Sequence, residues 1–392
     1  MALPIAYPLR NLAARPGRTL LTGGVVALVV VACTLFLGLI SSLKRTLVAS
    51  GDPMNLVVLR KGSTNDGASQ IDLDAYRSIR YLEGIAPDAT GRPLISPELV
   101  VQPFFRGRDG GRENVLVRGV EPIALDVHRG VRIVQGRMFR PSSGEAVVGR
   151  AVMGRYEGAR LGDTLLFGNG RWKVVGVLEA DGASFESEVW VDVRELARDA
   201  RRPYPYSGIR LRAASEADLV RLADRIAADP RYALEAQREI DYYEAQSESA
   251  NVLYYFVVGI AILAGLGAGF GASNTLYAAV RSRTREIGTL RALGFSRGAI
   301  LLAFETEAVV LALGGFALGA LLSLLATAAL QAWLGGVAFG STTFTTNVVT
   351  LRVGTGDLLA VLGLASAIGL LGGLGPAWRA ARMRPIEALR RA

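Results

Sequence analysis

The sequence RSRTREIGTLRALGFSRGAI occupies residues 281–300, between two apolar runs that are too long for helices of a soluble core. Ile287, Leu290 and Leu293 recur at helical spacing, Gly294 favours the end of that helix, and Ser296 can cap the next one. By the positive-inside rule, a cluster of arginines beside membrane spans indicates the cytoplasmic side. These arginines are Arg281, Arg283, Arg285, Arg291 and Arg297.

The composition indicates a protein that is part membrane and part soluble domain. Its 392 residues are 51% hydrophobic and 20% charged, with a mean hydropathy of +0.31. The net charge of +9 rests almost wholly on arginine, and many of the arginines flank apolar runs, so we interpret the charge as a topology signal. Nucleic-acid binding is the alternative, but no aromatic-plus-basic motif supports it. Cys33 is the only cysteine, which excludes an intrachain disulfide.

Four apolar runs are long enough to cross a bilayer and predict four transmembrane helices. The first could instead be a signal peptide, but it is longer than such a segment and is followed by Lys44 and Arg45. We expect residues 1–18 to form an amphipathic segment. Both this segment and the tail at 376–392 are rich in basic residues, which predicts that both termini are cytoplasmic. The expected spans are 19–42, 251–280, 299–333 and 358–375, with a periplasmic loop at 334–357.

Residues 43–250 lack a spanning run and predict an α+β domain between the first and second spans. We expect a helix at 216–228, an extended piece at 232–235, and a mostly β subdomain at 131–193 that is separate from the rest. A polar helix at 235–249 should continue into the second span. The expected strands are 56–59, 114–120, 146–148, 164–167, 172–178, 188–191 and 208–212.

Small residues recur four apart in two spans. Gly265 and Gly269, and likewise Gly315 and Gly319, would let another helix backbone approach closely, within the chain or in a dimer. The alternative is a helix that is merely crowded with glycine. Gly267 and Gly271 repeat the spacing.

Glu305 and Glu307 are acidic residues within the third apolar run. An ionised carboxylate at mid-membrane would cost about 2–3 kcal/mol unless it is paired or near the edge. We expect interfacial pairing with the arginines of residues 281–300. A proton or substrate site is the alternative.

Catalytic motifs are absent from the sequence. No lysine completes a G-x-x-x-x-G-K-[ST] loop, so the chain is not expected to bind ATP in that way. With one histidine and one cysteine, a zinc site and Ser-His or Cys-His pairs are not expected either. We interpret His128 as a loop residue and expect no catalytic residue, metal or cofactor on this chain.

The segment at 281–300 has two interpretations. It can be a simple topogenic turn between spans. Alternatively, the apolar face at Ile287, Leu290 and Leu293 docks on a cytoplasmic partner, with Glu286 and Arg291 supplying polar contacts.

The sequence RTREIGTLRALGFSRGAILLAFETEAVVLALGGFALG resembles the segment that joins the second and third spans of MacB/FtsX-like ABC transporter permeases. Agreement extends to LRNLAARPGRTLLT before the first span and to PAWRAARMRPIEALR at the end. In the α+β domain, IVQGRMFRPSSGEAVVGRAVMGRYEGARLGDTLLF and WKVVGVLEA are similar to the family as well.

The resemblance implies an inner-membrane permease that works as a dimer, with ATP and Mg²⁺ bound by a separate cytoplasmic ABC ATPase. It further implies mechanotransmission, in which ATP-driven motion of the ATPase is passed to the periplasmic domain. The expected cargo is an amphipathic peptide, drug, lipoprotein or glycolipid. A periplasmic adaptor and an outer-membrane duct are possible further partners. An FtsX-like regulator of a cell-wall hydrolase and a non-transporting receptor or scaffold remain alternatives. Membrane lipid is an expected partner, and nucleic acid is not. The family's coupling helix matches Arg285, Glu286, Gly288, Leu290, Ala292, Leu293 and Gly294.

Overall fold

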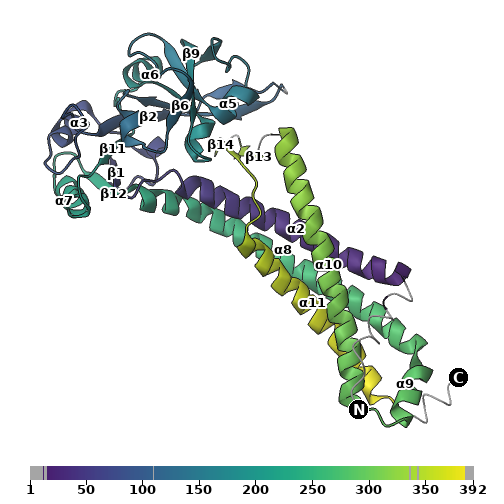
Figure 1. The fold of residues 1–392 in the computed structure, drawn as a ribbon. Coiled ribbons are helices and arrows are strands. Elements are labelled where there is room, and N and C mark those ends of the chain that lie inside the picture. The colour runs from purple at the N-terminus through teal and green to yellow at the C-terminus, as the bar shows by residue number, and fades with distance from the viewer. Residues whose placement is uncertain (1–11, 13–15, 109, 335–336, 342–343, 385–392) are drawn as a thin grey trace. The chain divides into compact units, whose positions relative to one another are not determined.

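The computed structural model describes residues 12, 16–108, 110–334, 337–341 and 344–384, and the chain divides into two compact units (Figure 1). The membrane unit comprises Met1–Ser41, Asn251–Trp333 and Leu351–Ala392. The α/β unit comprises Ser42–Ala250 and Leu334–Thr350. Most of the expected amphipathic segment at 1–18, and the end of the tail, lie outside the described residues.

Four long helices carry the four predicted spans. Their apolar parts are Thr19–Val48, Tyr254–Ser282, Arg297–Trp333 and Thr355–Arg382, with mean hydropathies between 1.9 and 2.7. The polar helix expected at 235–249 begins four residues later, at Glu239, because Leu234–Arg238 form strand β12. From Glu239 it continues into the second span as one uninterrupted helix. The helices are α2 (Pro16–Val48), α8 (Glu239–Ser282), α10 (Arg297–Leu334) and α11 (Thr355–Arg382).

Glycines bring α10 against α2 within the chain. A Cβ atom added at Gly315 would lie 2.8 Å from the carbonyl oxygen of Gly23, and one at Gly319 would lie 2.7 Å from that of Ala27. Larger side chains at these two positions would therefore collide with backbone. Gly265 of α8 similarly faces α11, where an added Cβ would lie 3.0 Å from a methyl group of Leu364.

The stripe of small residues on α11 was not predicted. Gly369 faces Ala312 of α10, where an added Cβ would lie 2.8 Å from the alanine Cβ, and Gly372 faces the backbone of Gly269 in α8. The stripe and the neighbouring Gly372 together let α11 pack against α10 and α8. Its members recur every four residues and are all buried: Ala365, Gly369, Gly373, Ala377 and Ala381.

The fourth span was expected at 358–375, but the helix that carries it does not end before Pro376. The helix α11 continues through it to Arg382. Pro376 is buried in the packed part of α11, and proline is tolerated in a membrane helix when neighbouring helices hold the flanking turns.

A ten-stranded sheet forms the α/β unit, in the order β12-β1-β11-β2-β5-β10-β7-β9-β6, with β8 paired to β9. Every expected strand is present, whereas β2 and β6 were not predicted. The strands are β1 (Asn55–Arg60), β2 (Ile95–Val101), β5 (Leu116–Val120), β6 (Arg132–Gly136), β7 (Glu145–Gly149), β8 (Thr164–Phe167), β9 (Gly170–Glu179), β10 (Glu188–Asp192), β11 (Gly208–Arg212) and β12 (Leu234–Arg238).

The expectation of a separate subdomain at 131–193 is wrong, because strand β2 joins the two halves of the sheet. Its first half pairs with β11, as in Ile95 with Leu211, and its second half pairs with β5, as in Leu99 with Gly119. Six of its seven residues are buried, so the strand is central.

Both faces of the sheet are covered by apolar residues. In β1, Leu56 and Val58 belong to one buried cluster, and Val57 and Leu59 belong to another. This follows from the period of two in a strand, which sends successive side chains to opposite faces. The accompanying helices are α3 (Leu73–Arg80), α4 (Ala124–Val127), α5 (Arg150–Arg155), α6 (Val193–Asp199) and α7 (Glu216–Ala227).

Two hairpins complete the α/β unit. One pairs β3 (Phe104–Arg106) with β4 (Arg112–Asn114). The other pairs β13 (Val337–Ser341) with β14 (Phe344–Val349), within the segment expected to be a plain loop at 334–357. The amide of Val348 donates a 2.9 Å hydrogen bond to Oγ of Ser187, so this hairpin is part of the unit.

Candidate functional site

Residues 281–300 form a short helix and the start of the next one, as predicted. Helix α9 spans Thr284–Ala292, with Leu293 as its C-cap, and is followed by Gly294, whose φ of 91° is left-handed. The amide of Phe295 donates to the carbonyl of Leu290 at 3.2 Å, and that of Gly294 to Arg291 at 3.2 Å, a Schellman motif. Oγ of Ser296 accepts the amide of Ala299 at 3.1 Å and caps α10.

The apolar residues of α9 do not share one docking face. Ile287 is fully buried, whereas Leu293 is 67% exposed and Leu290 is half-buried. Ile287 and Leu293 are six residues apart, which at about 100° per residue places them roughly 120° apart around the helix. The expectation that both form one free face is therefore wrong.

Ile287 packs inside the membrane unit. Its neighbours come from α8, α10 and α11, so the inner side of α9 is attached to three transmembrane helices. Close packing of this kind joins α9 to the helix bundle. The cluster comprises Val280, Ile287, Ile300, Phe304, Ala377 and Ala380.

The candidate coupling residues therefore fall into three groups. Ile287 and Gly288 are buried, and Leu290 and Arg291 are partly buried. The exposed members form what we call the outer ridge of α9. It comprises Arg285, Glu286, Ala292, Leu293 and Gly294.

A buried ion pair fixes the start of α9. Arg283 is the N-cap residue of α9, and its Nη1 lies 3.3 Å from Oε2 of Glu307 on α10. The two side chains are only 5% and 7% exposed. The expected pairing with an arginine of residues 281–300 is confirmed for Glu307.

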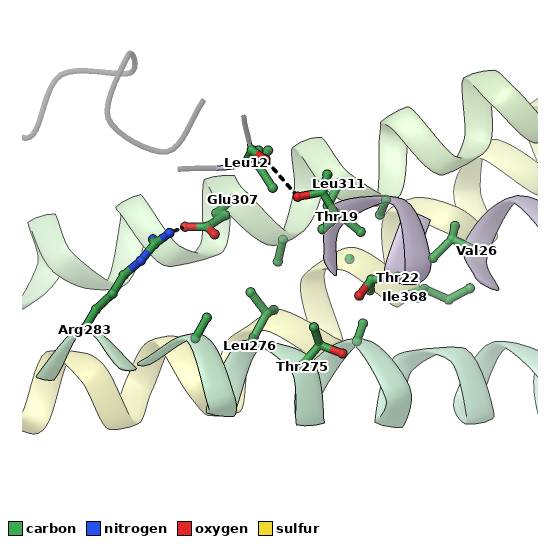
Figure 2. Close-up of a pocket in the computed structure, with 15 residues that line it drawn as sticks. Leu12, Thr19, Thr22, Val26, Thr275, Leu276, Arg283, Glu307, Leu311 and Ile368 are labelled. Atoms are coloured by element: carbon green, nitrogen blue, oxygen red, sulfur yellow. Dashed lines mark hydrogen bonds and ion pairs between the residues drawn. The ribbon is translucent and has the colours of Figure 1, made fainter. Parts of the chain in front are cut away.

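Glu307 and Arg283 line a small cavity in the membrane unit (Figure 2). Thr19, Thr22 and Thr275 contribute polar atoms from α2 and α8. The cavity volume is about 30 Å³, which is room for water but not for an organic substrate.

Glu305 has a different environment, and the pairing expected for it is wrong within the described residues. Its Oε2 atom is buried and accepts no hydrogen bond from any described residue. It lies where α10 meets α11, because a Cβ added at Gly373 would lie 3.0 Å from this oxygen. Glu305 and Glu307 thus have different surroundings, although they lie two residues apart.

A second cluster of buried charges lies in the α/β unit. Glu98 of β2 is 2.8 Å from Nη1 of Arg118 and 3.3 Å from Nη1 of Arg210. Arg118 also contacts Glu188 at 2.6 Å, and Arg210 contacts Asp66 at 2.7 Å. Burial alone would raise the pKa of Glu98, but Arg210, His128 and Arg118 outweigh it and hold this pKa well below its ordinary value.

His128 joins this cluster. It directly follows α4, as expected of a loop residue, but its side chain is only 1% exposed, with Nε2 2.8 Å from Oε1 of Glu98. Its contacts are with residues that are far away in sequence, so local pattern gave no signal for this burial.

We expect the α/β unit to lose stability in acid. The pKa of the Glu98 carboxyl is lower in the folded state than in the unfolded state, where it is about 4.3. Its ionised form therefore stabilises the folded state at pH values above about 4.3, and this stabilisation is lost as the pH falls below that value. The thermal midpoint, followed by fluorescence of buried Trp172 and Trp190, should be steady from pH 7 to 5 and fall below about pH 4.3. An unchanged midpoint at pH 3 would contradict this role of Glu98.

The family models identify the chain. Residues 19–229 match the MacB-like periplasmic core domain, and residues 258–385 match the FtsX-like permease C-terminal domain. This chain belongs to the MacB/FtsX-like family of ABC transporter permeases. The predicted family, the four apolar helices and the α/β domain between the first two are thereby confirmed.

Curated relatives agree. The pyoverdine export ATP-binding/permease protein PvdT of Pseudomonas entomophila is 31% identical over 66% of this chain and 40% of its own length. The macrolide export ATP-binding/permease protein MacB of Bdellovibrio bacteriovorus is 26% identical over 93% of this chain and 57% of its own length. The chain thus spans about half the length of these relatives.

Among solved structures, the periplasmic region of MacB from Actinobacillus actinomycetemcomitans covers 51% of this chain and 94% of its own. Its TM-score is 0.39, at 11% identity.

Proposed function

We propose that this chain is the permease subunit of a MacB/FtsX-like exporter and that the outer ridge of α9 docks on a separate ABC ATPase. ATP and Mg²⁺ are bound by that partner. Closure of the ATPase displaces α9, the bundle moves with it, and the α/β domain changes shape on the periplasmic side.

The observation that carries this proposal is the two-sided character of α9. Its inner side is attached by the buried Ile287 and by the Arg283–Glu307 ion pair beside its first residue. On its outer ridge Leu293 is 67% exposed, and the charged residues Arg285 and Glu286, about two turns earlier, are exposed as well. A helix that is rigidly held on one side and carries an exposed apolar anchor on the other suits transmission of a displacement.

We infer an amphipathic cargo, such as a peptide, drug, lipoprotein or glycolipid. The similar proteins PvdT and MacB are named for export of pyoverdine and of macrolides, two different chemical classes. The cavity that Arg283 and Glu307 line is about 30 Å³ in volume, too small for such a cargo, which supports work on cargo at the outer face over passage between the helices at this point. A periplasmic adaptor and an outer-membrane duct fit this arrangement.

The proposal includes a dimer in the inner membrane with both termini in the cytoplasm. Gly315 and Gly319 face α2 of the same chain, so the dimer must use other surfaces. The exposed side of α8 around Gly267, Phe270 and Gly271 offers one. An FtsX-like regulator would use the same motion, and binding of the α/β unit to a cell-wall hydrolase would distinguish it.

The test is a measurement of affinity between the full-length permease and its ATPase. Replacing Leu293 by aspartate should weaken ATPase binding at least about tenfold. The change puts a charge in place of an apolar side chain that is exposed in the permease alone and becomes buried in the proposed complex. Leu166 in β8 is also 67% exposed, so Leu166→Asp is the matched control and should bind normally. Equal affinity of the Leu293→Asp variant, or absence of any ATPase partner, would sink the proposal.

A further inference from the structure

An open groove of about 860 Å³ lies in the membrane unit where α8 and α11 end. Tyr277 of α8 forms one wall and the last turns of α11 form the other. It is separate from α9 and its outer ridge, because no residue of α9 lines it.

The first part of the groove is apolar. Leu371 is 71% exposed and Leu374 is 49% exposed, and Trp378 follows them on the same face of α11. Tyr277 crosses the groove, since a Cβ added at Gly375 would lie 2.8 Å from its hydroxyl oxygen. This surface suits hydrocarbon chains.

The far part of the groove is cationic. The guanidinium of Arg382 lies 4.5 Å from the ring centre of Trp378, and that of Arg379 lies 6.0 Å from that of Tyr277. Neither arginine forms an ion pair with a carboxylate among the described residues. Two guanidinium groups thus lie over aromatic rings, and no carboxylate of the described residues pairs with them.

We propose that this groove binds one anionic phospholipid, with the acyl chains along Leu371 and Leu374 and the phosphate between Arg379 and Arg382. Aromatic side chains mark the level of the headgroups, and basic pockets between transmembrane helices bind acidic headgroups. Arginine can also contact phosphate through two parallel N–H donors. The proposal requires only that the four helices lie in a membrane and is independent of ATPase coupling.

The experiment uses the full chain released from nanodiscs of phosphatidylglycerol or phosphatidylcholine, with retained lipid counted by native mass spectrometry. The wild type should retain phosphatidylglycerol and lose phosphatidylcholine. The double variant Arg379→Gln/Arg382→Gln should retain phosphatidylglycerol roughly tenfold less, because two phosphate contacts are lost. Arg281→Gln/Arg297→Gln removes the same charge from exposed residues beside α9 and is the control that should retain it.

A second variant, Trp378→Ala, leaves the net charge unchanged and should still weaken retention severalfold, because Arg382 loses its ring support. Equal loss in the Arg281/Arg297 control would overturn the site in favour of general charge attraction. If soluble glycerol phosphate displaces the retained phosphatidylglycerol, the groove needs no acyl chain. If the wild type is a dimer that dissociates in the double variant, the groove is occupied by a second copy of the chain. Either result would refute a lipid site.

Discussion

Replacing Glu98 by glutamine is expected to destabilise the α/β unit by about 3–5 kcal/mol. The substitution keeps the size of the side chain but removes the negative charge between Arg118 and Arg210, which are 2% and 0% exposed. The two buried guanidinium groups would then lack the negative charge of Glu98, and His128 would lose the carboxylate that lies 2.8 Å from its Nε2 atom. Because a typical domain is stable by only about 5–15 kcal/mol, much of the folded population should be lost.

Thermal unfolding of the full chain, followed by tryptophan fluorescence, measures this effect. Glu157→Gln is the control, because Glu157 is 55% exposed and its oxygen lies 3.7 Å from Arg106 in a surface pair. Surface pairs contribute about 1 kcal/mol or less. If both variants unfold at the wild-type temperature, the buried cluster does not stabilise the unit in the way described.

Replacing Glu307 by alanine should have the second largest effect and should act on the membrane unit. The change leaves the 5%-exposed Arg283 side chain without its carboxylate, and breaking a buried pair costs about 3–5 kcal/mol. Because Arg283 is the N-cap of α9, stimulation of the ATPase should fall together with stability.

Glu305→Gln is the matched control on the same helix, because the Oε2 atom of Glu305 has no hydrogen-bond partner among the described residues. We expect this control to be near neutral. In a double-mutant cycle, Arg283→Gln and Glu307→Gln should couple by about 0.5–3 kcal/mol. Additive effects of the two changes would mean that the ion pair does not join α9 to α10.

Much of the fold follows from sequence pattern. The four spans and the strands with β-branched residues, such as 56–59 and 208–212, are correctly predicted because each carries a local signal. Strand β2 was missed because Pro97 and Glu98 interrupt its apolar pattern, and Glu98 is buried only because distant arginines meet it. The hairpin at 337–349 was missed because Gly- and Thr-rich sequence is typical of a loop as well.

The candidate site is only partly predictable. The helix, its glycine end and the serine cap of the next helix depend on neighbouring residues and were correct. The division of α9 into a buried side and an outer ridge depends on α8, α10 and α11, which the local sequence does not place. The choice of Glu307 over Glu305 as the partner of Arg283 likewise depends on the rotation of α10.

The most direct test of the central claim is a distance measurement in the reconstituted permease–ATPase complex. Spin labels at Arg221→Cys, an exposed position on α7, report the separation of the two α/β units in a dimer. We predict that trapping the ATPase with ATP and Mg²⁺ shifts this distance by several ångströms in the wild type and in Leu166→Asp. The shift should be absent in Leu293→Asp. An undiminished shift in Leu293→Asp would contradict transmission through α9.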